Sequence, residues 1–120
     1  MKALIVIAHG SRREQSNNEI IGMVDRIRSM VNDQYEQITH SFLEICDPSL
    51  NEAVADCIDR GAREVTVYPF FLNSGNHVQQ DIPDMIEELN AVYPDCHIQL
   101  LQHFGKSEDM ASLIADHVSR

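Results

Sequence analysis

The sequence lacks the features that mark disordered, fibrous and membrane-spanning chains. Among 120 residues there are only five glycines and four prolines, while 43% of the residues are hydrophobic. That composition is typical of a globular protein. The longest apolar run, Ala3 to Ala8, is far shorter than the ~20 residues needed to cross a bilayer. A length of 120 residues suits one domain, so we expect residues 1–120 to form a single α/β domain with no membrane partner.

Basic residues are also scarce. Nine Lys and Arg stand against 19 Asp and Glu, which gives a formal net charge of −10. A surface of this charge repels polyanions and attracts cations. We therefore expect no nucleic-acid partner, and a cationic ligand is the better match.

Cysteine is limited to Cys46, Cys57 and Cys96, an odd number without the spacing of a metal-binding pair. This pattern indicates neither a disulfide framework nor a zinc knuckle. The amino terminus passes from Lys2 directly into a short apolar strand. Since a signal peptide needs a longer apolar stretch and a small-residue cleavage site, we expect a cytoplasmic protein.

Apolar periodicity predicts strands and helices in strict alternation. Strands are expected over residues 3–8, 38–45, 65–72 and 97–101, and helices over residues 13–31, 50–60, 81–93 and 107–118. Such alternation predicts a three-layer α/β sandwich in which a four-stranded parallel sheet has helices on both faces. A doubly wound strand order, 2-1-3-4, is the expected one.

Histidines follow several of the predicted strands. His9 comes after the first, Glu44 lies near the end of the second, His77 follows the third, and His103 follows the fourth. Ligands of open α/β sheets bind beyond the carboxyl ends of the strands, where the strand order reverses. In the order 2-1-3-4, His9 and His77 would face each other across that crevice. Each alone has a structural interpretation, but the pair favours a functional one, because imidazole binds divalent transition metals and titrates near neutral pH.

Two arginines open the first predicted helix. Arg12 and Arg13 oppose the positive end of the helix dipole, which indicates either an anion to be bound or two solvated side chains. No dinucleotide motif, P-loop or nucleophile elbow occurs in the sequence. A His-Gly pair after the first strand also occurs in the phosphoglycerate-mutase-like phosphatases, but those carry an Arg where this chain has Ala8.

Three blocks of the sequence resemble the CbiX-type sirohydrochlorin chelatases, the class II tetrapyrrole chelatases. The resemblance covers nearly the whole chain and is in register with the predicted strand ends. In the final loop, His103 stands where family members tend to carry Pro. The blocks are His9-Gly10-Ser11-Arg12; Phe42-Leu43-Glu44 with Pro48; and Pro69-Phe70-Phe71-Leu72 with Gly75, His77-Val78 and Asp81-Ile82-Pro83.

The resemblance implies insertion of a divalent metal into sirohydrochlorin, on the way to cobalamin or siroheme. Cobalt is the expected metal, with iron and nickel as alternatives, and no organic cofactor is implied. His9 and His77 match the two histidines with which the family handles metal. A short chain of this type is expected to form a homodimer with its site in the cleft between subunits.

These residues give a mechanistic hypothesis. His9 and His77 bind the incoming metal, one of them or its symmetry mate accepts a pyrrole proton, and Glu44 is a secondary candidate for accepting protons or guiding the metal. The residues expected to bind the substrate are Ser11, Arg12, Arg13 and Gly75, with Lys106 as a weaker candidate. A non-catalytic metal or tetrapyrrole carrier would use the same histidines and stays an alternative.

Overall fold

The computed structural model describes the backbone of all 120 residues and every side chain except that of His77. The four strands are β1 (Lys2–Ala8), β2 (Gln37–Phe42), β3 (Glu64–Pro69) and β4 (His97–Leu100). The helices are α1 (Glu14–Val31), α2 (Leu50–Asp59), α3 (Ile82–Val92) and α4 (Asp109–Val118). A π-helical turn, η1 (His77–Asp81), precedes α3, and a 3-10 turn, η2 (Phe104–Lys106), precedes α4.

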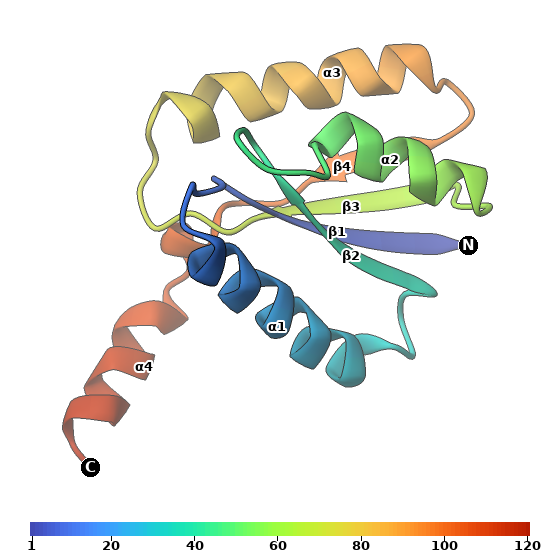
Figure 1. Cartoon of the computed structure of the whole chain (residues 1–120). Helices are drawn as coiled ribbons and strands as arrows, with labels where there is room; N and C mark the ends of the chain where they lie inside the picture. Colours follow the sequence, from blue (N-terminus) through green and yellow to red (C-terminus); the bar gives the residue numbers. More distant parts are fainter.

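The strands form one parallel sheet in the order β2-β1-β3-β4. This confirms the predicted fold class and strand order. Because the strands are parallel, their four carboxyl ends lie together along one side of the sheet, where the loops that follow the strands gather (Figure 1). We call this side the carboxyl edge. His9 follows β1, and His77 begins η1 in the connection after β3, the strand next to β1.

The apolar run of β1 is explained by burial on both faces. Ile5 and Ile7 belong to the core beneath α2 and α3, whereas Leu4 and Val6 belong to the core beneath α1. Figure 1 shows α2 and α3 above the sheet and α1 below it. A central strand of a parallel sheet has a continuous apolar sequence because neither of its faces is exposed to water.

Local sequence explains both ends of α2. The Ser49 hydroxyl accepts a hydrogen bond from the Glu52 amide at 3.1 Å, and the Glu52 carboxylate accepts one from the Ser49 amide at 2.9 Å. This is the capping box that the spacing indicates. Beyond the helix, Gly61 takes a φ of +109°, a conformation that favours glycine.

Two strands end three residues earlier than predicted. The second ends at Phe42 rather than at residue 45, because the chain turns sharply at Ile45, whose φ is +74°. The third ends at Pro69 rather than at residue 72, since proline cannot donate to the ladder. The connection expected to be a plain loop over residues 73–80 begins to wind into η1 at His77.

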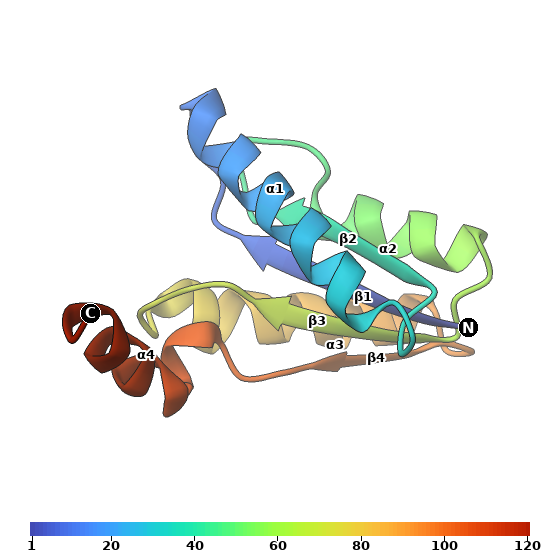
Figure 2. The ribbon, with the colours of Figure 1, turned by 90° about the horizontal axis from the view of Figure 1, so that it is seen from below.

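The apolar faces of the last two helices differ from the prediction. Val92 is in phase with Ile86 and Leu89 on α3, yet it is exposed, because the buried stripe continues to Tyr93 instead. The predicted sandwich places its helices against the sheet, but α4, all of whose residues are described, has none buried. In Figures 1 and 2 this helix stands away from the rest of the chain. In the part of the chain that the structure describes, no helix has the length and apolar content to span a bilayer.

Candidate functional site

An imidazole and a carboxylate meet at the carboxyl edge of the sheet. Nε2 of His9 lies 3.1 Å from Oε1 of Glu44, and both side chains are about half exposed, at 47% and 51%. They come from adjacent strands, since His9 follows β1 and Glu44 lies two residues after β2. The structure therefore brings together two of the three residues that the sequence assigns to catalysis.

The backbone fixes this pair. The Glu44 amide donates to the His9 carbonyl at 3.1 Å, so the β2–α2 loop continues alongside β1 beyond the sheet. Gly10 has a φ of +96°, and a Cβ there would overlap the carbonyl oxygen of Glu44. Glycine is therefore required for both its conformation and its size. The Cys46 amide donates to the Glu44 carbonyl at 2.8 Å and closes the turn at Ile45.

Asn17, on the first turn of α1, ties the same two loops together. Its amide oxygen accepts from the Ser11 amide at 3.0 Å, and Nδ2 donates to the Ser11 carbonyl at 2.7 Å. Nδ2 also lies 3.0 Å from Sγ of Cys46. Sequence reasoning missed this residue. The sequence signal that could have identified it is an asparagine near the start of a helix, where the side-chain amide can form hydrogen bonds with nearby backbone groups.

The hydrogen bonds of His9 bear on its protonation. Besides the contact to Glu44, Nδ1 lies 3.1 Å from the carbonyl oxygen of Gly10. A neutral imidazole carries a proton on one nitrogen only, so it can donate to only one of these oxygens. Both contacts become hydrogen bonds at once when the ring is an imidazolium.

The predicted substrate-binding residues lie around this pair. Arg12 and Arg13 are exposed and precede α1, which begins at Glu14. Ser11 accepts a hydrogen bond from the Arg13 amide at 3.0 Å, so its hydroxyl helps to shape the turn. Gly75 is exposed, and its carbonyl accepts the amides of two residues that follow it, at 3.1 and 3.0 Å. The side chain of His77 lies outside the described residues, so its assignment stays a prediction.

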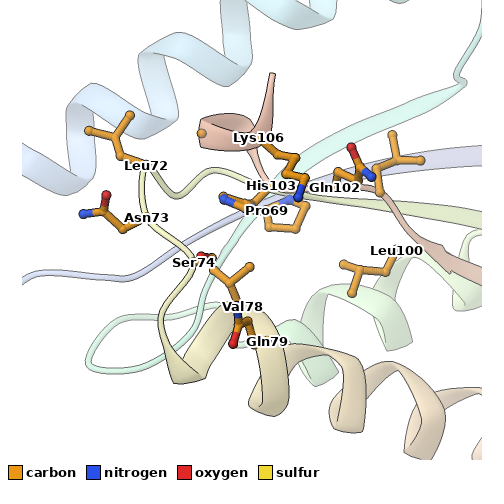
Figure 3. A pocket seen from close by; sticks show the side chains of 12 residues that line it. Pro69, Leu72, Asn73, Ser74, Val78, Gln79, Leu100, Gln102, His103 and Lys106 are labelled. Atoms are coloured by element: carbon orange, nitrogen blue, oxygen red, sulfur yellow. The ribbon is translucent and has the colours of Figure 1, made fainter. Parts of the chain in front are cut away.

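A second feature of this edge is a cavity of about 500 Å³ between the β3–α3 loop and the turn that follows β4. Figure 3 shows Asn73, Ser74 and Gln79 on one side and His103 and Lys106 on the other. In its described lining the polar groups are amides, a hydroxyl, an imidazole and an ammonium, with no Asp or Glu. In a chain of net charge −10, such a lining is suited to an anion. Apart from His103 and Lys106, its polar groups were not predicted, because Asn, Ser and Gln in a loop carry no distinctive pattern.

The two loops around this cavity are held together at Gly105. Its amide donates to the Phe71 carbonyl at 2.9 Å, and a Cβ at this position would overlap the backbone of Leu72. Phe71 also lies near His9, with ring centroids 6.5 Å apart. The His9–Glu44 pair and the cavity therefore flank the same short segment after β3.

Metal ligands within one chain are few. Among the described side chains, no cluster of three His, Cys, Asp or Glu is suited to hold a metal. Cys57 and Cys96 are buried in the core, and burial raises the pKa of the Cys57 thiol to about 11. Cys57 is 1% exposed and packs inside the core beneath α2, so it does not face the carboxyl ends of the strands. His9 and Glu44 offer one nitrogen and one oxygen, which leaves an open coordination set.

Comparison with known proteins gives a consistent family. The CbiX family model matches residues 3–120. A sirohydrochlorin cobaltochelatase from Methanococcus maripaludis is 33% identical over 86 residues, which are 72% of this chain and 58% of that protein. A sirohydrochlorin ferrochelatase from Priestia megaterium is 23% identical over 119 residues, 99% of this chain and 44% of the relative. The chain thus spans about half the length of these curated relatives.

A solved structure agrees with the fold over nearly the whole length. A putative cobalamin (vitamin B12) biosynthesis CbiX protein from Marinobacter aquaeolei VT8 superposes with a TM-score of 0.81 at 28% identity. The match covers 99% of this chain and 95% of that one. Sequence and architecture therefore point to one family.

Proposed function

This chain belongs to the CbiX family, and on that premise we propose that it inserts a divalent metal ion into sirohydrochlorin. Cobalt is the expected metal, with iron and nickel as alternatives, in cobalamin or siroheme synthesis in the cytoplasm. Of the relatives named above, one is named a sirohydrochlorin cobaltochelatase and the other a sirohydrochlorin ferrochelatase. The observation that carries the proposal is the His9–Glu44 pair at the carboxyl edge of the sheet.

Chelation has two requirements. The protein must hold the metal weakly enough to release it, and two pyrrole protons must be removed from the tetrapyrrole. A closed set of four protein ligands would retain the metal, whereas one nitrogen and one oxygen can deliver it. As a divalent ion enters the ring, two protons depart, so each needs a base within hydrogen-bond reach. The metal is therefore a substrate here, and the residues supply its entry and the exit of the protons.

His9 suits the role of proton acceptor. With its proton on Nδ1, directed at the Gly10 carbonyl, the imidazole carries on Nε2 the lone pair that can bind the metal or take a pyrrole proton. Once Nε2 is protonated, Glu44 at 3.1 Å neutralises the imidazolium. We assign Glu44 as the second acceptor, to which that proton can pass.

His77 is proposed as the second metal-binding histidine, and a homodimer as the active form. The chain spans about half the length of its curated relatives, and one copy offers an open ligand set. We propose that residues 1–120 form one chelatase-like unit and that a second copy completes the cleft. Closed two-fold symmetry would then place two equal half-sites together.

The tetrapyrrole is an anion with carboxylate arms, and we propose two sets of residues that meet them. Lys106 and His103 line the cavity after β4 and lie opposite amide groups from the β3–α3 loop (Figure 3). Around His9, the proposed substrate-binding residues are Ser11, Arg12, Arg13 and Gly75. The cavity, which carries no carboxylate in its described lining, makes Lys106 a stronger candidate than the sequence alone indicates.

Metal insertion by purified variants tests the proposal. The absorbance change of sirohydrochlorin is followed with substrate in excess, using cobalt, iron and nickel salts in parallel. We expect His9→Ala and His77→Ala each to lose roughly 100-fold or more in rate, the usual scale for a positioned acid–base group. His97→Ala is the matched control, because His97 is exposed at the start of β4, at the opposite edge of the sheet.

Turnover separates an enzyme from a carrier. A binding module would stop after one equivalent of metal or tetrapyrrole, whereas an enzyme continues. Wild-type rates in both histidine variants would contradict the site assignment, and a single-equivalent burst in the wild type would contradict the activity.

A further inference from the structure

Asn17 is the point at which the loop that carries His9 meets the loop that carries Glu44. Its Oδ1 accepts a hydrogen bond from the Ser11 amide at 3.0 Å, while Nδ2 donates to the Ser11 carbonyl at 2.7 Å. Nδ2 also donates to Sγ of Cys46 at 3.0 Å. Ser11 lies two residues after His9. Cys46 likewise lies two residues after Glu44, so one side chain holds both loops just beyond the two members of the pair.

The thiol of Cys46 closes a small network with the same groups. Its Sγ donates to the Ser11 carbonyl at 3.1 Å. The Ser11 carbonyl, the Asn17 amide and the Cys46 thiol therefore contact one another in a closed triangle, and we call these three residues the loop tie. Its contacts are part-buried, and hydrogen bonds are stronger where the local dielectric is low.

The loop tie specifies an amide side chain at position 17. Asn17 makes three bonds there, one through Oδ1 and two through the two hydrogens of Nδ2. A carboxylate offers acceptors alone, and a hydroxyl offers a single donor, so neither Asp nor Ser could make all three bonds. The position is thus defined by its chemistry and not only by its place in a helix.

The backbone is bent in both loops between the pair and the loop tie. Gly10 has a φ of +96° and Ile45 a φ of +74°. The second value is unfavourable for a β-branched residue, and such a conformation persists only where the surrounding contacts impose it. The side chain of Ile45 is 59% exposed, so its own packing does not hold the turn. Hydrogen bonds do so instead, from the Cys46 amide to the Glu44 carbonyl at 2.8 Å and from Cys46 to the rest of the loop tie.

This strained turn lies directly between Glu44 and the loop tie, so the loop tie controls where the carboxylate points. Release of Cys46 would allow Ile45 to return to negative φ, and Glu44 would move with it. Oε1 of Glu44 lies 3.1 Å from Nε2 of His9, a contact that weakens steeply once its angle is lost. A displacement of about 1 Å at a catalytic group can cost about 100-fold in rate.

We propose that Asn17 is a positioning residue for proton acceptance by the His9–Glu44 pair. By joining Ser11 to Cys46, it fixes the separation of the imidazole and the carboxylate. It acts through the two loops and not by contact with the reacting atoms. Its effect on rate rests on the chelatase activity proposed above, whereas its effect on the loops can be measured without substrate.

Amide hydrogen exchange in the full chain tests the effect on the loops. The Glu44 amide donates to the His9 carbonyl and the Cys46 amide to the Glu44 carbonyl, so their exchange rates report whether the loops stay together. We expect Asn17→Ala to speed exchange of both amides by about 10-fold or more, while the amides of β1 keep their wild-type rates. Asn18→Ala is the matched control, because Asn18 is the same residue type, one position along α1 and exposed. Unchanged exchange of both amides in a folded Asn17→Ala chain would overturn the proposal.

A double-mutant cycle tests the effect on rate. If Asn17 acts through the carboxylate of Glu44, loss of the side chain and loss of the carboxylate should not add. We expect Asn17→Ala to lower kcat by about 10-fold or more, with little change in the KM for the tetrapyrrole. In a Glu44→Gln chain the same substitution should lower kcat little further. Losses that multiply in the double variant, as a general destabilisation would give, would contradict a positioning role.

Cys46 offers a second variant with a conservative rescue. Cys46→Ala removes both sulfur contacts, whereas Cys46→Ser keeps a donor for the Ser11 carbonyl and an acceptor for Asn17. We expect Cys46→Ala to speed exchange of the Glu44 amide and to lower kcat, and Cys46→Ser to restore most of both. Equal effects of the two substitutions would contradict the loop tie. A wild type that inserts no metal would contradict the proposed function, whereas the exchange rates would still decide whether Asn17 positions the loops.

Discussion

Nε2 of His9 and Oε1 of Glu44 lie 3.1 Å apart on the ends of two adjacent parallel strands, and both are open to solvent. The spacing arises from backbone pairing that continues past the sheet, with the Glu44 amide donating to the His9 carbonyl. Because the backbone holds His9 beside Glu44 in this way, His9 can accept a proton without a change in the structure of either loop.

The charge of Glu44 is the first test of this pair. Glu44→Gln keeps the shape of the side chain but removes the carboxylate that neutralises a protonated His9. We expect the turnover rate to fall by about 10- to 100-fold, within or just below the usual range for acid–base groups, while Glu44→Asp retains part of it. The measurement is the steady-state rate of metal insertion. Glu64→Gln, exposed at the start of β3 at the other edge of the sheet, should be unaffected, and an equal loss there would point to a general effect of charge.

Gly10 is the second test, because it sets the approach of the two loops. A Cβ at Gly10 would overlap the carbonyl of Glu44, and the φ of +96° is unfavourable for alanine. We expect Gly10→Ala to lower the free energy of unfolding by roughly 1–3 kcal/mol and to reduce activity as well. Gly22→Ala is the control: a Cβ there meets nothing within 4 Å, and alanine in a helix interior should add about 1 kcal/mol. Urea unfolding of both variants checks the opposite signs.

Apolar periodicity was sufficient to predict the alternation of strands and helices, whereas the strand order 2-1-3-4 was expected from the common doubly wound arrangement and is confirmed. It was also sufficient to place His9 at the carboxyl edge. These features depend on local pattern and on the rule that ligands bind where the strand order reverses.

The features that could not be predicted depend on contacts between residues that are far apart in the sequence or on the tertiary environment. The bonds of Asn17 to Ser11 and Cys46 join residues 6 and 29 positions apart. The turn at Ile45 places a β-branched residue at positive φ, against its own preference. The apolar stripe of α4 was read correctly as a helix face, but nothing in the pattern indicates that its own chain leaves it uncovered.

Lys106 tests the proposed contact with the carboxylates of the substrate. It lines a cavity with no Asp or Glu in its described lining, so its charge is not neutralised there. We expect Lys106→Ala to raise the KM for the tetrapyrrole several-fold with little change in kcat, because the contact is the same in the ground and transition states. The difference should shrink as salt is added, since screening weakens exposed charge pairs. Lys2→Ala, at the opposite edge of the sheet, is the control, and a matching rise in KM there would indicate a nonspecific electrostatic effect.

His40 gives a prediction about stability and pH. It lies half-buried on β2, with its ring centroid 5.6 Å from that of Phe42. Burial lowers the pKa of His40, partly offset by the nearby Asp25 carboxylate, while Arg28 lowers it further. The folded state therefore prefers neutral His40, and the unfolded state binds the proton more readily as pH falls.

The stability that neutral His40 contributes is present above the pKa of an unfolded histidine, about 6.5, and is lost as pH falls through that value and the lower folded-state pKa. We expect the unfolding free energy of the wild type to decrease more steeply than that of His40→Gln between about pH 7.5 and pH 5. Urea titrations over this interval measure both slopes. His97→Gln, an exposed position, should keep the wild-type slope. Parallel curves for the wild type and His40→Gln would show that the burial of His40 carries no proton linkage.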